Sequence, residues 1–111
     1  MNIEQIENGV AVVRPFGRIT LGRECQALEA AVRGLVREEC RRVVLDLGAV
    51  EYLDSMGVGT LAMICAVAQR AGGELRLSAA TGLVLKVLKL TRMDTVLPMY
   101  PTAAEAVLGW S

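Results

Sequence analysis

The stretch that most constrains the fold of this chain is "RRVVLDLGAV", residues 41–50. It is a nearly continuous apolar run that is rich in valine and leucine. A run of this kind, without regular polar alternation, is typical of a strand that other elements cover on both faces. The sequence therefore predicts that this strand lies inside a sheet packed against helices.

Strand-like and helical patterns alternate on both sides of this stretch, in the order strand, strand, helix, strand, helix, strand, helix, strand, helix. The segments, in chain order, are "NIEQIENGVAVVRPFG" with a turn at Asn8-Gly9, a helix with Leu28, Val32, Leu35 and Val36 on one face, "RRVVLDLGAV", a helix from about Val58 to Arg70 closed by Gly72-Gly73, "ELRLSA", "GLVLKVLKL", "TVLPMY" and "AAEAVLGW" after Pro101-Thr102. Strands that are separated by helices pair in parallel through right-handed crossovers. The fold class expected is α/β, with a mixed sheet, an N-terminal hairpin, βαβ crossovers and about four helices.

Length and charge bound the number of domains and the classes of partner. The 111 residues fit one domain, 1–111, without an evident linker or repeat. Twelve basic and twelve acidic side chains give a net charge of zero, which argues against a nucleic-acid-binding surface. The longest apolar run, residues 56–68, is too short to span a bilayer, and no signal-peptide pattern opens the chain. We therefore expect a cytoplasmic protein without membrane insertion.

Two further counts bear on metal binding and on the surface. The chain has no histidine, and its three cysteines (Cys25, Cys40 and Cys65) form no Cys-x-x-Cys pair, so no metal site is expected. We expect reduced thiols that pack as small apolar side chains. The hydrophobic content of 53% is high for a soluble domain, which leaves room for a partner protein or a homodimer on its surface.

The segment "DSMGVG", residues 54–59, comes after the buried strand and admits several interpretations. The structural one is a helix start, because Asp and Ser are both preferred N-caps and glycines allow a helix to approach a strand closely. A catalytic serine is disfavoured, because Leu53 stands where the hydrolase motif needs glycine and no histidine is present as a base. "GVGTLA" fits a dinucleotide-loop pattern, but the next strand ends apolar and the domain is short for that fold.

The remaining interpretation is a phosphorylation switch at Ser55. A serine on the first turn of a helix has its hydroxyl at the surface, and phosphorylation there adds roughly 1.5 to 2 negative charges. The helix N-terminus tolerates this charge, so the domain should stay folded. A partner docked over the same surface would instead meet new bulk and charge beside Asp54.

The stretch "VVLDLGAVEYLDSMGVGTL" resembles the signature of the STAS domain, the module of bacterial anti-sigma factor antagonists. The residues that match this pattern are Val43, Val44, Leu45, Asp46, Leu47, Val50, Leu53, Asp54, Ser55, Gly57, Val58, Gly59 and Leu61. The remainder, "AGGELRLSAATGLVLKVLKLTRMDTVLPMYPTAAEAV", is similar to the C-terminal half of that family, which has a Gly-Gly turn, a strand, a short helix, a last strand and a C-terminal helix. The resemblance covers essentially the whole chain and also implies a STAS fold.

The resemblance implies a partner-switching protein that is not an enzyme. In that family the unphosphorylated antagonist binds an anti-sigma factor that is also a serine kinase of the GHKL type. The kinase phosphorylates the serine that maps to Ser55, the complex separates, and a metal-dependent serine phosphatase reverses the reaction. ATP and Mg²⁺ belong to the kinase, so no cofactor, metal or catalytic residue is expected in this chain.

The partner-binding residues expected on this basis are Asp54, Ser55, Met56, Gly57, Gly59 and Thr20. Thr20 stands where many family members carry Asp, in a loop that lies near the serine in the family fold, and Met56 stands where a second Ser or Thr is frequent. These departures bear on which kinase recognises the chain. The alternatives are a STAS subunit of a lipid ABC transporter or another non-sigma complex, without phosphorylation, and a nucleotide-binding module.

Overall fold

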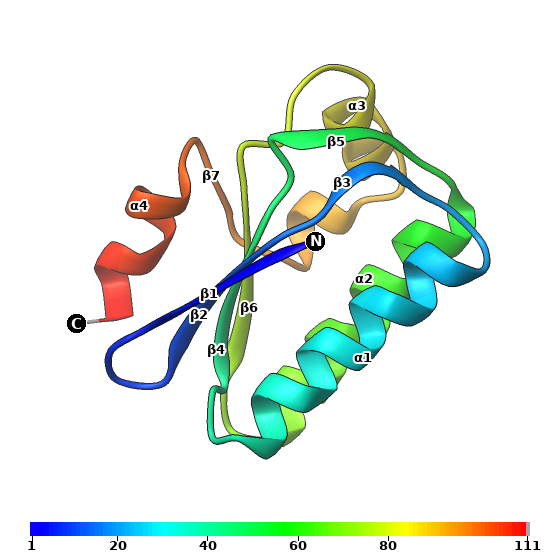
Figure 1. Ribbon diagram of the computed structural model, residues 1–111. Coiled ribbons are helices and arrows are strands. Elements are labelled where there is room, and N and C mark those ends of the chain that lie inside the picture. The colour runs from blue at the N-terminus through cyan, green and yellow to red at the C-terminus, as the bar shows by residue number, and fades with distance from the viewer. Residues whose placement is uncertain (111) are drawn as a thin grey trace.

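The computed structural model describes residues 1–110, and its strands form two sheets (Figure 1). The strands of the five-stranded sheet, in the spatial order β1-β2-β4-β6-β7, span Asn2–Ile6, Val10–Arg14, Arg42–Asp46, Glu74–Ser78 and Met99–Tyr100. β1 is antiparallel to β2, and the other neighbours are parallel. A separate two-stranded parallel sheet pairs β3 (Phe16–Ile19) with β5 (Ala49–Leu53). The last residue of the expected domain, Ser111, lies outside the described residues.

Four helices and two 3₁₀ turns complete the fold. The helices α1 to α4 span Arg23–Arg37, Ser55–Arg70, Gly82–Leu90 and Ala103–Val107, and the 3₁₀ turns η1 and η2 span Met93–Thr95 and Leu108–Trp110. In Figure 1, α1 and α2 lie side by side on one face of the larger sheet, while α4 lies on the opposite face. α3 packs against β5. Within residues 1–110, no helix combines the length and the apolar character needed to cross a membrane.

The predicted burial of the central strand on both faces is confirmed. Val43 and Leu45 belong to the main core between the sheet and the helices α1 and α2. Val44, which points the other way, packs in a second apolar cluster with Val12 and Trp110. This division follows from the alternation of side chains along a strand. The α/β class, the mixed sheet, the N-terminal hairpin and the number of helices are likewise as predicted.

The single strand expected over residues 41–50 is wrong, because the chain forms two strands there. β4 ends at Asp46, and the Asp46 carboxylate accepts a hydrogen bond of 2.8 Å from the Gly48 N–H, which closes a tight turn. The chain then starts β5, which pairs with β3 rather than with the larger sheet. β3 was not predicted as a separate strand, since Pro15 was expected to stop the strand before it or to place that strand near an edge of the sheet. The fold therefore has seven strands where the sequence indicated five.

Two other boundaries differ from the prediction. α2 begins at Ser55, three residues before Val58, because Asp54 caps the helix earlier than the apolar pattern starts. The last strand is only Met99–Tyr100, because the chain before it forms the turn η1. The hairpin turn is as predicted, with positive φ angles of 68° at Asn8 and 73° at Gly9.

The three cysteines are free, as predicted. Cys40 and Cys65 are buried and Cys25 is half-buried. Burial raises the pKa of the Cys40 and Cys65 thiols, with a smaller contribution from Glu38 and Glu74 respectively. Both thiols are therefore more firmly protonated than an exposed cysteine, which suits their place in the core.

The C-terminal segment is fastened to the far face of the sheet by Trp110. The Arg76 guanidinium lies 4.0 Å from the centroid of the Trp110 ring and donates a hydrogen bond of 2.7 Å to the Ala106 carbonyl. The Trp110 indole N–H donates to the Glu74 carboxylate at 3.1 Å. α4 and η2 therefore cover the face that α1 and α2 leave open.

Replacing Trp110 by alanine should lower the free energy of unfolding by about 3 kcal/mol, as is typical for a buried aromatic side chain. Trp110 is 7% exposed, whereas Leu108 in the same 3₁₀ turn is 72% exposed. Leu108→Ala is therefore the matched control and should change the free energy by less than about 0.5 kcal/mol. Urea unfolding followed by circular dichroism measures both. Equal losses in the two variants would contradict the fastening role of Trp110.

Candidate functional site

The site expected around Ser55 forms where β3 and β5 end side by side. Ile19 and Leu53 are paired in the small sheet, and the Asp54 N–H donates to the Ile19 carbonyl at 3.4 Å. The loop that leads into α1 therefore lies next to the start of α2, although 33 residues separate Leu21 from Asp54. We call the surface formed by Thr20, Leu21, Asp54, Ser55 and Met56 the serine corner.

Asp54 is the N-cap of α2 and also binds the neighbouring loop. One carboxylate oxygen accepts a hydrogen bond of 2.8 Å from the Gly57 N–H, and the other accepts one of 3.2 Å from the Leu21 N–H. The bond from Gly57 is the main cause that holds the pKa of Asp54 below its ordinary value, and the bond from Leu21 acts in the same direction. Asp54 is therefore a charged clamp between two segments, and it caps the helix in place of Ser55.

Ser55 is the first residue of α2 and is exposed. Its hydroxyl makes no hydrogen bond to any residue in the range 1–110. Two apolar side chains beside it are open to solvent, because Met56 is 49% exposed and Leu21 is 69% exposed. Thr20 is half-buried, and its hydroxyl donates to the Glu24 carboxylate at 3.2 Å. The corner thus presents one hydroxyl without a partner in residues 1–110, together with two exposed apolar side chains.

The two glycines of the motif have different roles. A Cβ atom at Gly57 would lie 2.4 Å from the Ile19 carbonyl oxygen, so only glycine lets α2 approach β3 this closely. A Cβ atom at Gly59 would meet nothing within 4 Å, and this residue is exposed. The predicted close packing of strand and helix is therefore confirmed at Gly57, while Gly59 does not contribute to it.

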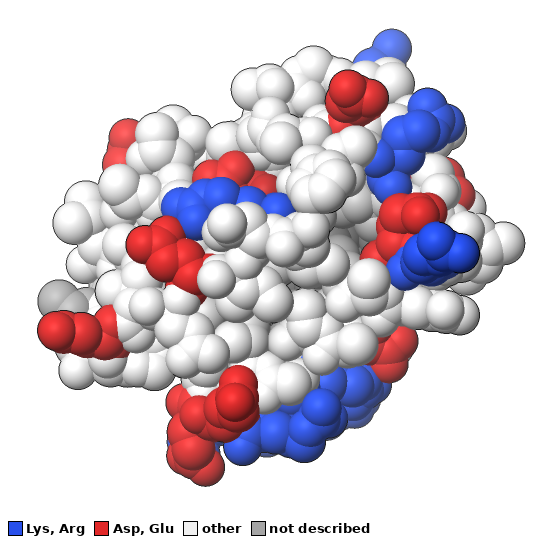
Figure 2. Space-filling model, in the orientation of Figure 1, with Lys and Arg blue, Asp and Glu red and all other residues white. Residues whose placement is uncertain are grey.

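The arrangement suits modification of the serine better than catalysis by it. Neither histidine nor any group of three metal-ligating side chains occurs in residues 1–110, and no base engages the Ser55 hydroxyl. Beyond the capping carboxylate of Asp54, the first turn of α2 carries no acidic side chain, and its remaining N–H groups and dipole favour an anion. On the face shown in Figure 2, groups of cationic and anionic side chains lie close to one another among uncharged residues.

Sequence patterns missed other exposed side chains near the corner. Phe16 is 66% exposed on β3, and the Arg18 guanidinium lies 4.4 Å from the centroid of the Tyr52 ring on β5. Leu21 was missed in the same way. The sequence feature that could have indicated them is the segment "RPFGRITL", which has more large apolar side chains than a solvent-exposed turn usually has.

Known proteins of similar sequence and fold include several anti-sigma factor antagonists. The STAS domain family model matches residues 2–106. An anti-sigma-F factor antagonist of Mycobacterium tuberculosis, RsfB, is 31% identical over 104 residues, which cover 92% of this chain and 82% of that protein. The crystal structure of an anti-sigma factor antagonist from Mycobacterium paratuberculosis is 30% identical, covers 97% of this chain and 90% of the other, and has a TM-score of 0.83.

The antagonist SpoIIAA shares the fold at lower identity. Its unphosphorylated form is 19% identical, with a TM-score of 0.82, and covers 96% of this chain and 91% of the other. The chain belongs to the STAS domain family, as its residues 43–61 predicted. Family membership agrees with the prediction that the chain is a binding protein and not an enzyme.

The Asp54 clamp predicts a specific dependence of stability on pH. Because its pKa in the folded state is lowered from an ordinary value near 3.8, this carboxylate stabilises the fold above that value and loses the contribution as pH falls through the lowered pKa. Asp54→Asn should therefore flatten the fall in unfolding free energy below about pH 4. Urea unfolding at several pH values measures how the free energy of unfolding of each protein depends on pH. Asp94→Asn removes an exposed carboxylate on η1 and is the control; an equal change in both profiles would contradict the clamp.

The glycines offer a matched pair. Gly57→Ala should lower the free energy of unfolding by about 2 kcal/mol, because the new methyl group forces α2 away from the Ile19 carbonyl. Gly59→Ala should raise it by about 0.5 to 1 kcal/mol, since alanine is the better residue in an open helix position. Thermal and urea unfolding measure both. The assigned close approach at Gly57 would be wrong if the two variants shifted stability in the same direction.

Proposed function

We propose that this chain is an anti-sigma factor antagonist that acts by partner switching. Unphosphorylated, it binds an anti-sigma factor that is also a serine kinase of the GHKL type, and phosphorylation of Ser55 releases it. The observation that carries the proposal is the state of Ser55. Its hydroxyl is exposed and unbonded at the start of α2, while the neighbouring Asp54 does the capping.

This geometry supports a switch that leaves the fold intact. A phosphoryl group on Ser55 would add roughly 1.5 to 2 negative charges at a helix N-terminus, where backbone N–H groups and the helix dipole accommodate them. No hydrogen bond of the folded chain has to break, because the hydroxyl makes none within residues 1–110. The same charge, beside Asp54 and next to the exposed Met56, changes the surface that a docked protein would cover.

The relatives support the class of partner. RsfB is described as an antagonist of an anti-sigma-F factor. SpoIIAA has been solved in a phosphorylated form that has a TM-score of 0.75 to this chain at 18% identity, so the fold itself accommodates phosphate. The exposed partner-binding residues that we propose are Ser55, Met56 and Gly59, with Thr20 and Asp54 at the margin. Buried Gly57 contributes by positioning α2.

The remaining components belong to the same proposal. The kinase supplies ATP and Mg²⁺, a metal-dependent serine phosphatase restores the hydroxyl, and the antagonist works in the cytoplasm without a cofactor of its own. A homodimer remains a prediction from the high apolar content. Co-purification with an ABC transporter ATPase, instead of a kinase, would favour the transporter alternative.

Ser55→Asp should weaken binding to the kinase at least about tenfold, because it places a charge in the interface. Ser55→Ala should bind like the wild type and accept no phosphate. Both variants should keep the wild-type circular dichroism spectrum. Calorimetry measures the affinity of each variant for the purified GHKL-type kinase. Mass spectrometry after incubation with this kinase and ATP locates the phosphate.

Gln69→Glu is the matched charge control for this test. Gln69 is exposed on the same helix, about 21 Å along its axis from Ser55, and its substitution should leave affinity unchanged. Failure of an active, purified kinase to phosphorylate Ser55 would refute the switch.

A further inference from the structure

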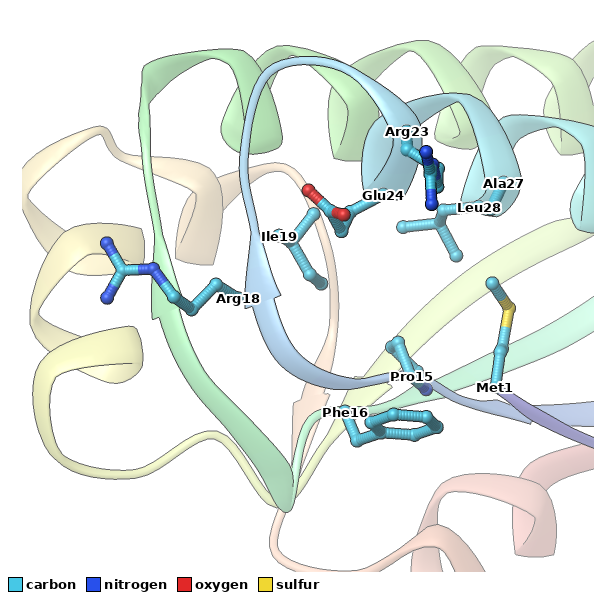
Figure 3. A pocket seen from close by; sticks show the side chains of 9 residues that line it. All are labelled: Met1, Pro15, Phe16, Arg18, Ile19, Arg23, Glu24, Ala27 and Leu28. Atoms are coloured by element: carbon cyan, nitrogen blue, oxygen red, sulfur yellow. The ribbon is translucent and has the colours of Figure 1, made fainter.

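An apolar groove lies between β3 and α1, beside the serine corner (Figure 3). Its volume is about 200 Å³. Pro15 and Phe16 form one wall and Ala27 and Leu28 of α1 form the other, while Ile19 lies at one end. The groove is open to solvent and is large enough for one large apolar side chain.

The groove is continuous with the serine corner through two residues. Ile19 lines the groove, and its carbonyl accepts the hydrogen bond from the Asp54 N–H. Glu24 also lines it and accepts a hydrogen bond from the Thr20 hydroxyl of the corner. A protein that covers Ser55 therefore reaches the groove with its next contacts. The exposed side chain of Phe16 lines the groove as well.

Two arginines line the groove, Arg18 and Arg23, and neither has a partner carboxylate within residues 1–110. The side chain of Arg23 extends from α1 toward the groove in Figure 3, and within residues 1–110 no carboxylate lies within 4.0 Å of it. Arg18 instead points away and stacks on Tyr52. The Glu24 carboxylate is engaged by Thr20. A ligand that fits this groove is therefore apolar at its centre and negatively charged next to Arg23.

We propose that the partner of the serine corner anchors in this groove. The anchor is a protein segment with one large apolar side chain, which fills the space between Phe16 and Ala27, and a nearby carboxylate, which pairs with Arg23. The proposal rests on the proposed function, because the partner is the kinase that binds around Ser55. The groove supplies affinity, and Ser55 supplies the switch. This division matches interfaces in which a central apolar side chain in a pocket carries most of the binding energy.

The test is calorimetry of binding between the intact chain and the purified kinase. Ala27→Phe fills the groove from an exposed position on α1 and should weaken binding about tenfold or more, whereas Ala30→Phe, exposed one turn later and outside the groove, should change it less than about twofold. Phe16→Ala removes the opposite wall and should also weaken binding. Its control is Leu90→Ala, which truncates an equally open apolar side chain on α3. Arg23→Glu should weaken binding through repulsion of the partner's carboxylate.

The outcomes separate this inference from the function on which it rests. Wild-type binding and Ser55 phosphorylation, together with groove variants that bind normally, would overturn the groove and leave the switch in place. A wild-type chain that binds no kinase would overturn both. Loss of binding in Ala27→Phe and Phe16→Ala but not in Arg23→Glu would overturn the acidic part of the anchor. Ultracentrifugation of the chain alone excludes another occupant, since a dimer that Ala27→Phe dissolves would identify a second copy in the groove and overturn the proposal.

Discussion

The end of the molecule that carries Ser55 depends on one carboxylate that holds two segments together. Asp54 accepts one hydrogen bond from the start of α2 and another from the loop after β3. Gly57 makes this possible by letting the helix approach the Ile19 carbonyl, where any Cβ would clash. Together with the pairing of β3 and β5, these two features fix the position of Thr20, Leu21 and the groove relative to Ser55.

Because Asp54 performs the capping, Ser55 is not needed for it. A change at the Ser55 hydroxyl leaves the Asp54 cap of α2 in place. It also leaves the core contacts of α2 and the pairing of β5 with β3 intact. In the proposed switch, phosphorylation would therefore act mainly by adding charge to the surface. A local electrostatic change can in this way control binding without a change of fold.

Much of the fold could be predicted from sequence because periodicity reports burial directly. The central strand, the hairpin turn at Asn8-Gly9 and the main helices all follow from such patterns, and the STAS signature located Ser55. The small sheet escaped prediction because β3 is four residues long and contains a glycine, and because its pairing with β5 is a contact distant in sequence. The groove and the bond from Leu21 to Asp54 depend on that pairing, so no local pattern could reveal them.

In the proposed function, phosphate at Ser55 changes the surface of the protein and not its fold. The most direct test of this proposal compares the enzymatically phosphorylated wild-type chain with the unmodified chain in two measurements, the free energy of unfolding and the affinity for the kinase. We expect the free energy of unfolding to change by less than about 1 kcal/mol while affinity falls about tenfold or more. A phosphorylated chain that binds the kinase as tightly as the unmodified chain, or that loses affinity only because it unfolds, would contradict the proposal.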